Sequence, residues 1–305
     1  MTAHGFRHEA LIYVDEDEFL AGTLPFVREG IGAGEALLVA VGPEKQTLLE
    51  AALGADADAV RFSDMRACGR NPARLIPFWR DFLDATDERP ARGVGEPIWP
   101  GRTPAEIDEC RRHESLLNVA FEGAGEWALL CPYDGTALDD EVLAAVDCSH
   151  RRVRRLGAGA ASERFADAPD CFRGGLAACP ADTETFTFRV DGLRDVRRRV
   201  AHAASAAGLP VGAAADLVAA TSEVAANSVT HGGGCGRLRF WPAGRGLVVE
   251  IADRGRLREP LVGHVRPTPP QQRGRGLWLA NQLCDLVQIR SNPAGTVVRL
   301  HGQPA

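Results

Sequence analysis

The chain has 305 residues, of which 45% are hydrophobic, and its formal net charge is −6 at pH 7. This length favours two domains over one. The acidic balance argues against a protein whose main partner is the phosphate backbone of nucleic acid, because that attraction needs clustered positive charge. Nucleotide or protein partners fit the charge better.

No apolar run approaches the roughly 20 residues that span a bilayer, and residues 1–10 lack the charged-then-apolar layout of a signal peptide. We therefore expect a cytoplasmic protein without a membrane partner. The chain has 8 cysteines, and no two of them form a CxxC pair. Their scatter favours buried or reduced thiols over a metal site or a set of disulfides.

Short apolar runs alternate with helical patterns through the first half of the chain. Strands are expected at 10–14, 36–41, 60–62 and 126–134, and helices at 18–31, 43–53, 73–85, 103–121 and 139–150. Alternation of this kind predicts crossover units, and therefore a parallel sheet with helices on its faces. We expect this α/β domain to span residues 8–150.

The pattern dissolves over residues 151–183, which are rich in Gly, Ala, Pro and Arg. Such a composition indicates a linker, and its arginines are expected to be solvated. The following domain, 184–305, has a different order of elements. A strand is expected at 185–190, helices at 193–208 and 213–232, strands at 236–242 and 246–255, a helix from 274, and strands at 287–291 and 295–302. This order predicts a two-layer α/β sandwich whose mixed or antiparallel sheet is covered by helices on one face.

Three polar residues recur every fourth position on the second helix of this domain and so share one of its faces: Glu223, Asn227 and His231. The strand at 246–255 ends in Asp253-Arg254-Gly255. About twenty residues later, Gly274-Arg275-Gly276-Leu277 opens the next helix. Each motif alone would be weak, but their order on a helix, a strand end and a helix start favours a nucleotide site over coincidence.

These motifs resemble the ATP-binding domains shared by histidine kinases, DNA gyrase and bacterial anti-sigma kinases, over roughly the last 120 residues. The resemblance implies ATP and Mg²⁺ as cofactors, with Asn227 holding the metal on the phosphates. It implies that Asp253 accepts from the adenine amino group, that Gly274 and Gly276 cover the phosphates, and that the hydroxyl of Thr296 lies near the adenine. The expected nucleotide-binding residues are Asn227, Asp253, Gly255, Gly274, Arg275, Gly276, Leu277 and Thr296.

A histidine kinase needs a phosphoacceptor histidine on a dimerising helical hairpin ahead of this domain, and the segment before residue 185 is too short and too Gly-rich for one. The passage from a strand directly to two helices instead resembles the anti-sigma kinases. In these relatives a Glu one turn before the metal-binding Asn is the catalytic base on a serine, a position that Glu223 matches. The resemblance implies two partners, a sigma factor and an anti-anti-sigma protein of the STAS type, and leaves a homodimer open.

Residues 8–150 resemble the sensory domain named for methanogens, methylotrophs and a dichloromethane-responsive regulator. The resemblance rests on stretches beginning at His8 and Gly95, on Arg112-His113-Glu114 and on Cys131-Pro132-Tyr133-Asp134. It implies a RecA-like core and the sensing of an unknown small-molecule signal. The candidate sensory residues are His8, Tyr13, Trp99, His113 and Tyr133.

Residues 42–45 lack the spacing of a phosphate-binding loop, so no second nucleotide site is predicted in this domain. Structural or ligand-lining roles are favoured over catalysis there. For the whole chain, two alternatives to a serine kinase stay open. One is a module that binds ATP without phosphotransfer. The family often has a second glycine in the motif that begins here with Asp253-Arg254-Gly255, and this chain lacks it. This alternative is favoured if Arg256 stiffens the loop that follows. The other is a histidine kinase-like protein that acts on a separate phosphoacceptor.

Overall fold

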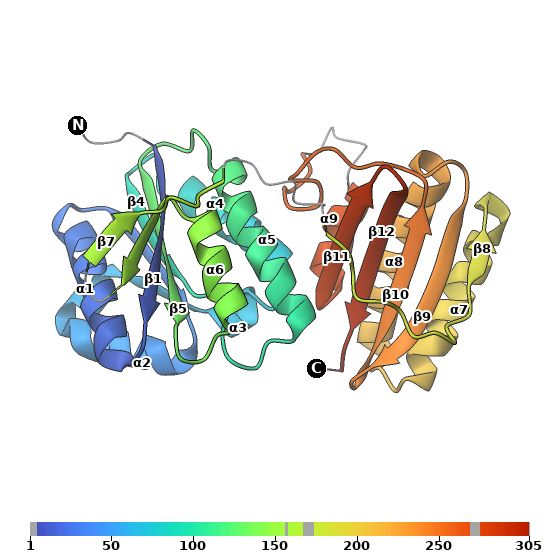
Figure 1. Cartoon of the computed structure of the whole chain (residues 1–305), viewed down its shortest axis with the longest axis horizontal. Coiled ribbons are helices and arrows are strands. Elements are labelled where there is room, and N and C mark those ends of the chain that lie inside the picture. Colours follow the sequence, from blue (N-terminus) through green and yellow to red (C-terminus); the bar gives the residue numbers. More distant parts are fainter. Residues whose placement is uncertain (1–4, 156–157, 167–173, 269–274, 305) are drawn as a thin grey trace. The chain divides into compact units, whose positions relative to one another are not determined.

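The computed structural model describes residues 5–155, 158–166, 174–268 and 275–304. It divides into two compact units, Met1–Pro169 and Asp170–Ala305, which are described separately (Figure 1). Among the described residues, no helix combines the length and the apolar character needed to cross a membrane.

The described strands of the N-terminal unit form a seven-stranded sheet in the order β3-β2-β4-β5-β1-β6-β7. Every neighbouring pair is parallel except β6 and β7, which are antiparallel. The strands are β1 (Phe6–Tyr13), β2 (Ala36–Val41), β3 (Arg61–Asp64), β4 (Ala91–Gly95), β5 (Trp127–Asp134), β6 (Arg152–Arg155) and β7 (Ala158–Ala161). This confirms the expected parallel α/β sheet.

Helices cover both faces of this sheet, as parallel strands require. Figure 1 shows α1 (Glu16–Gly32) and α2 (Pro43–Leu53) on one side of the sheet, and α4 (Leu75–Asp84), α5 (Pro104–Ala120) and α6 (Asp140–Ser149) on the other. A short helix, α3 (Met65–Cys68), follows β3. The sequence fixes the start of α5 locally: Thr103 and Glu106 form a capping box, with Pro104 in the first turn.

The pleat of β1 divides its side chains between two buried layers. Leu11 and Tyr13 join the core beneath α1 and α2, together with Leu130 of β5. Side chains that alternate with these along the strands point to the other face of the sheet. His8 of β1 and Cys131 of β5 therefore lie on the face covered by α5 and α6. The face beneath α5 and α6 thus carries polar groups inside a closed layer.

Two strands fall within the stretch expected to be a linker. β6 pairs in parallel with β1, and Arg154 of β6 donates to Glu9 of β1 through Nε at 2.9 Å. The prediction that the arginines of this stretch are solvated was therefore wrong for Arg154. Its guanidinium is held by a carboxylate more than a hundred residues away, which local composition cannot indicate.

The described strands of the C-terminal unit form a five-stranded antiparallel sheet in the order β11-β12-β10-β9-β8. They are β8 (Phe186–Phe188), β9 (Gly236–Ala243), β10 (Gly246–Asp253), β11 (Leu286–Asn292) and β12 (Gly295–Gly302). Three helices lie behind this sheet in Figure 1: α7 (Leu193–Ala206), α8 (Val211–His231) and α9 (Arg275–Leu283). This confirms the expected two-layer sandwich. The carboxyl end of α8 lies beside the carboxyl end of β10 and beside the amino end of α9.

Candidate functional site

The last turns of α8 lie against the first turn of α9. A Cβ added to Gly276 would lie 3.0 Å from Asn227 Nδ2 and 3.1 Å from Glu223 Oε2. The two polar side chains therefore converge on the backbone at the start of α9, and only a glycine leaves them that space. Within the part of the chain that the structure describes, neither the Glu223 carboxylate nor the Asn227 amide has a hydrogen-bond or ion-pair partner.

The Asp253 carboxylate is fixed where β10 ends. Its Oδ2 accepts from the Ser228 hydroxyl at 2.6 Å, and its Oδ1 accepts from the Gly255 N–H at 2.7 Å. A Cβ on Gly232, which caps α8, would lie 2.4 Å from Asp253 Cγ. The carboxylate is therefore packed against the end of the helix and held at both oxygens, each of which keeps lone pairs for another donor.

The hairpin of β11 and β12 holds the loop that follows Asp253. Thr296 donates to the Gly255 carbonyl at 2.8 Å, and its oxygen lies 2.8 Å from Ser291 Oγ. Because Thr296 has a single hydroxyl hydrogen, Ser291 is the donor in the second bond. Ser291 Oγ in turn accepts from the Leu257 N–H at 2.9 Å. The loop is thus tied to the hairpin at two points.

A cavity of about 340 Å³ opens among these groups. This volume is within the usual range for a small-molecule site. Its lining comprises polar groups that include Asn227, Asp253 and Thr296, and apolar walls from α8, α9, β12 and the loop after β10. The lining residues are Val224, Asn227, His231, Gly232, Asp253, Gly255, Arg256, Leu257, Val262, Leu277, Thr296 and Val298.

The cavity brings together most of the nucleotide-binding residues expected from the sequence. Arg275 and Gly276 are not in its lining but begin the adjoining helix α9. Glu223 is not in the lining either, and its carboxylate lies beside Gly276. Gly274 lies outside the described residues. Sequence reasoning missed Ser228 and Gly232, although both were visible as the neighbour of Asn227 and the first glycine after the helix.

The donor set suits a magnesium-bound nucleotide. Mg²⁺ prefers oxygen ligands and keeps much of its water, so one amide oxygen from Asn227 beside the phosphates is adequate. The apolar walls match the faces of a purine ring, and the carboxylate of Asp253 is an acceptor at their edge. The start of α9 directs backbone N–H groups and the positive end of its dipole outward, which suits phosphate oxygens.

In the N-terminal unit a second cavity, of about 320 Å³, lies where the parallel strands end. Tyr13 donates to Glu96 Oε1 at 2.9 Å, and the Lys45 ammonium lies 2.5 Å from the same oxygen. Burial raises the pKa of Glu96, although Lys45 and Tyr13 act in the opposite direction, and burial with Glu96 raises the pKa of Tyr13. Trp99 also lines this cavity. Two of the candidate sensory residues, Tyr13 and Trp99, therefore share one hollow at the edge where ligands bind in parallel sheets.

The candidates His8 and Tyr133 lie elsewhere, in a buried cluster under α5 and α6. His8 Nε2 lies 3.1 Å from Glu114 Oε2 and 3.4 Å from Cys131 Sγ, and His150 Nε2 lies 3.1 Å from the same Glu114 oxygen. The Tyr133 ring meets His150 edge-on. Sequence reasoning quoted Glu114 and Cys131 in the stretches that carry the resemblance but did not name them as candidates, and it did not single out His150. The three residues come from separate segments.

Burial dominates the electrostatics of this cluster. Burial alone would raise the pKa of Glu114, but the neighbouring imidazoles of His150 and His8 hold it well below its usual range. Burial and the neighbouring His150 lower the pKa of His8, whereas burial and Glu114 raise the pKa values of Cys131 and Tyr133. The remaining candidate, His113, is buried on α5 and lines none of the cavities described above.

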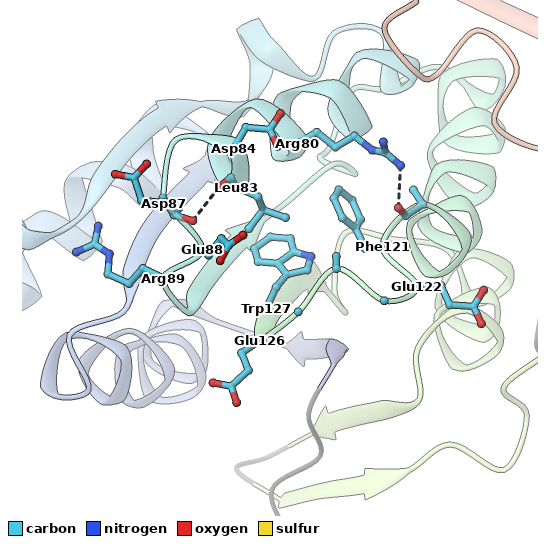
Figure 2. Close-up of a pocket in the computed structure, with 15 residues that line it drawn as sticks. Arg80, Leu83, Asp84, Asp87, Glu88, Arg89, Phe121, Glu122, Glu126 and Trp127 are labelled. Carbon is cyan, nitrogen blue, oxygen red and sulfur yellow. Dashed lines mark hydrogen bonds between the residues drawn. The ribbon is translucent and has the colours of Figure 1, made fainter. Parts of the chain in front are cut away.

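A wider hollow, of about 880 Å³, lies at the opposite, amino-terminal ends of β4 and β5. Figure 2 shows Trp127 and Phe121 near its centre, with their ring centroids 5.7 Å apart, and acidic side chains around its rim. Arg80 donates to the Ala120 carbonyl at 2.9 Å across one side. Because ligands bind at the carboxyl ends of parallel strands, this position does not favour a functional site.

Comparison with known proteins identifies both units. Residues 7–151 match the family model described as MEDS, the MEthanogen/methylotroph, DcmR Sensory domain. Residues 186–301 match the model of the Histidine kinase-like ATPase domain. The two matches confirm the resemblance to this sensory domain and the resemblance to histidine kinase-like ATP-binding domains. An ATPase domain of this type implies ATP binding.

One match among solved structures is the crystal structure of the RsbU and RsbW domains of Rv1364c from Mycobacterium tuberculosis. The identity is 20% and the TM-score 0.29, and the match covers 41% of this chain and 32% of that chain. This chain therefore spans about a third of the length of that structure. No curated protein matches the chain.

Proposed function

We propose that this chain, in which a MEDS domain precedes a histidine kinase-like ATPase domain, is an anti-sigma regulatory factor dependent on ATP and Mg²⁺. It binds a sigma factor and phosphorylates a serine or threonine of an anti-anti-sigma antagonist of the STAS type, under the control of a small-molecule signal at the N-terminal domain. One observation carries the proposal: Asn227 and Asp253 line a single cavity, and Gly276 at its edge leaves room for both Asn227 and Glu223.

Nucleotide recognition is assigned to the ends of β10 and α8. Asp253 accepts from the adenine amino group, and its orientation is set by Ser228 and Gly255. Asn227 supplies an amide oxygen to the metal, for which its lack of any partner among the described residues leaves it available. Bound Mg-ATP supplies the phosphoryl group that is transferred.

Glu223 is the proposed catalytic base. Transfer to a serine hydroxyl forms a new O–P bond, breaks the bond that leaves ADP, and releases the hydroxyl proton, which the Glu223 carboxylate accepts. Its position one helical turn before Asn227 places it beside the metal ligand. General base catalysis of this kind contributes about 10²–10⁴-fold in rate.

A serine acceptor is favoured over a histidine by what precedes the ATPase domain. The described residues between β7 and β8, 162–166 and 174–185, form no helix, whereas a phosphoacceptor histidine needs a helical hairpin. The strand β8 leads through one short turn into α7. The sigma factor and its antagonist are proposed from the resemblance to anti-sigma kinases.

Two substitutions separate the proposed roles. Asn227→Ala should abolish Mg-ATP binding in calorimetry, whereas Glu223→Gln should preserve it and slow phosphorylation of an antagonist by at least about 100-fold. Asp216→Asn, on an exposed position of the same helix, is the control and should change neither. Equal loss of binding in the Asn227 and Glu223 variants would contradict this division, and acid-labile phosphate on a partner would identify a histidine kinase-like protein instead.

A module that binds ATP without phosphotransfer is the second candidate, because Arg256 lines the cavity in the loop that follows Asp253. A guanidinium there can hold phosphate oxygens without assisting transfer. Tight Mg-ATP binding with no phosphorylated serine or threonine on any antagonist would favour this function. Arg256→Gly, which restores a small residue to the loop, would then be expected to release phosphotransfer.

A further inference from the structure

We propose that the N-terminal domain holds one divalent metal ion of the zinc type, in a closed tetrahedral site between β1, α5, β5 and the end of α6. This site is separate from the nucleotide site proposed above. The four ligands are His8, Glu114, Cys131 and His150.

The distances between the four ligand atoms fit one ion. All of them lie within 4.8 Å of one another, and three of the separations are 3.1, 3.4 and 3.1 Å. Metal–ligand bonds of about 2.0–2.3 Å in a tetrahedral zinc site place the ligand atoms roughly 3.3–3.8 Å apart. Small adjustments of side chains therefore suffice to close the site around an ion.

Both imidazole rings are oriented by partners outside the cluster. His150 Nδ1 lies 3.0 Å from the Val146 carbonyl, which can only accept, and 3.0 Å from Ser149 Oγ. The Ser149 hydroxyl has carbonyls of its own helix as acceptors, so the arrangement assigns the hydrogen to His150 Nδ1. His8 Nδ1 lies 3.3 Å from Asn118 Oδ1. The Asn118 amide is itself fixed, because its Nδ2 donates to the Ser149 carbonyl at 2.8 Å.

With Nδ1 protonated, each ring presents the bare lone pair of Nε2 to the same oxygen of Glu114. Two lone pairs facing a carboxylate repel unless a positive charge lies between them. Glu114 Oε1 and His150 Nε2 are also buried atoms without a hydrogen-bond partner among the described residues. A cation at the centre resolves both conflicts, and orientation of ligating histidines by carbonyl groups is the usual arrangement around bound metals.

The donor set selects the kind of ion. Two imidazole nitrogens, a carboxylate oxygen and a cysteine sulfur disfavour Mg²⁺ and Ca²⁺, which prefer oxygen alone, and suit Zn²⁺. All four side chains are at most 2% exposed, so the site has no position open to water. Four protein ligands without an open position indicate a structural or regulatory ion and not a catalytic one.

Metal analysis of the full chain, purified without a polyhistidine tag or chelator, should find one zinc ion per chain. After metal removal, Co²⁺ should produce the intense visible bands of a tetrahedral site and a near-ultraviolet band from a cobalt–thiolate bond. Cys131→Ser should abolish the thiolate band and weaken Co²⁺ binding by at least about 100-fold, since loss of even an outer partner costs roughly 10–100-fold.

The matched control is Cys110→Ser. Cys110 is equally buried in the same domain, but its thiol donates to the Pro97 carbonyl at 3.3 Å. This variant should keep the metal, the bands and the affinity.

The proposal would be overturned if the metal-depleted wild-type chain kept its far-ultraviolet circular dichroism spectrum and yet showed neither band in excess Co²⁺. The four side chains would then share protons instead of a metal ion. Persistence of the thiolate band in Cys131→Ser would do the same. The wild-type titration needs no substitution, so it decides the question even if that variant does not fold. None of these readouts depends on ATP, so they are independent of the proposed kinase activity.

Discussion

The Ser228 hydroxyl lies 2.6 Å from Asp253 Oδ2 and donates to it, joining the last turn of α8 to the end of β10. The residue that follows the proposed metal ligand thus orients the proposed adenine acceptor. The same hydroxyl also lies 3.2 Å from the Val224 carbonyl of its own helix. Because Ser228 is fully buried, no water replaces this hydrogen bond if it is lost.

Ser228→Ala should lower the affinity for Mg-ATP by about 10-fold in calorimetry. A hydrogen bond to a charged group contributes roughly 1.5–3 kcal/mol, and Asp253 keeps its bond from Gly255. Ser222→Ala is the control, because among the described residues the Ser222 hydroxyl bonds only its own helix, at the Val218 carbonyl, 2.7 Å away. Equal affinities of the two variants would show that Ser228 does not position the carboxylate.

Gly276→Ala should weaken Mg-ATP binding without lowering the free energy of unfolding. The added methyl displaces the flexible ends of Asn227 and Glu223, while alanine favours the helix by about 0.5–1 kcal/mol over glycine. Gly212→Ala, in the open first turn of α8, should raise the free energy of unfolding and leave binding unchanged. Urea denaturation and calorimetry of both variants provide the comparison.

Gly295→Ala should destabilise the C-terminal domain by about 1–3 kcal/mol more than Gly244→Ala. Both glycines have positive φ, of 138° and 56°, so both variants incur backbone strain. Only at Gly295 would the new Cβ also clash with a neighbour, the Asp253 carbonyl, whereas nothing lies within 4 Å at Gly244. Thermal unfolding should rank the two, and similar values would contradict the packing of this hairpin on Asp253.

The free energy of unfolding of the wild type, relative to that of Glu96→Gln, should decrease as pH rises. Burial raises the pKa of Glu96 in the folded state, so its stabilising contribution is complete below the pKa of the unfolded chain and is lost as pH rises through the folded pKa. Denaturant unfolding between pH 4 and 8 measures this slope.

Glu44→Gln should give a slope of the opposite sign. A hydrogen bond to its own backbone, together with Arg66, lowers the pKa of Glu44, so its contribution is lost as pH falls. Matching slopes for Glu44 and Glu96 would contradict the burial of Glu96.

The alternation of apolar runs predicted four strands of the N-terminal sheet, but not β6 and β7 in the expected linker, and not β4. Its sequence, Ala91 to Gly95, has too many glycines to resemble a strand. The reason is packing: a Cβ on Gly93 would lie 2.8 Å from the Trp127 ring and 2.9 Å from that of Trp79. Two tryptophans from elsewhere in the chain occupy the space, and their position depends on the completed fold.

For the ATPase domain, helical spacing and the order of motifs predicted residues that the structure brings to one cavity, because these residues lie at or near the ends of elements. The buried cluster of the N-terminal domain could not be found in this way. Glu114 and His113 are neighbours on α5 and both are buried, but only Glu114 meets His8 and His150. No local spacing links these three residues, since they lie on β1, on α5 and at the end of α6.

The place of β1 in its sheet bears on how the N-terminal domain folds. β1 lies between β5 and β6, so it pairs with strands that are synthesised more than a hundred residues later. Closing such a loop is slow, and until it closes the apolar residues of β1 have no neighbours in the sheet. The β9–β10 and β11–β12 hairpins pair adjacent segments instead. We therefore expect the second half of the chain to refold faster, and the first half to depend more on chaperones while it leaves the ribosome.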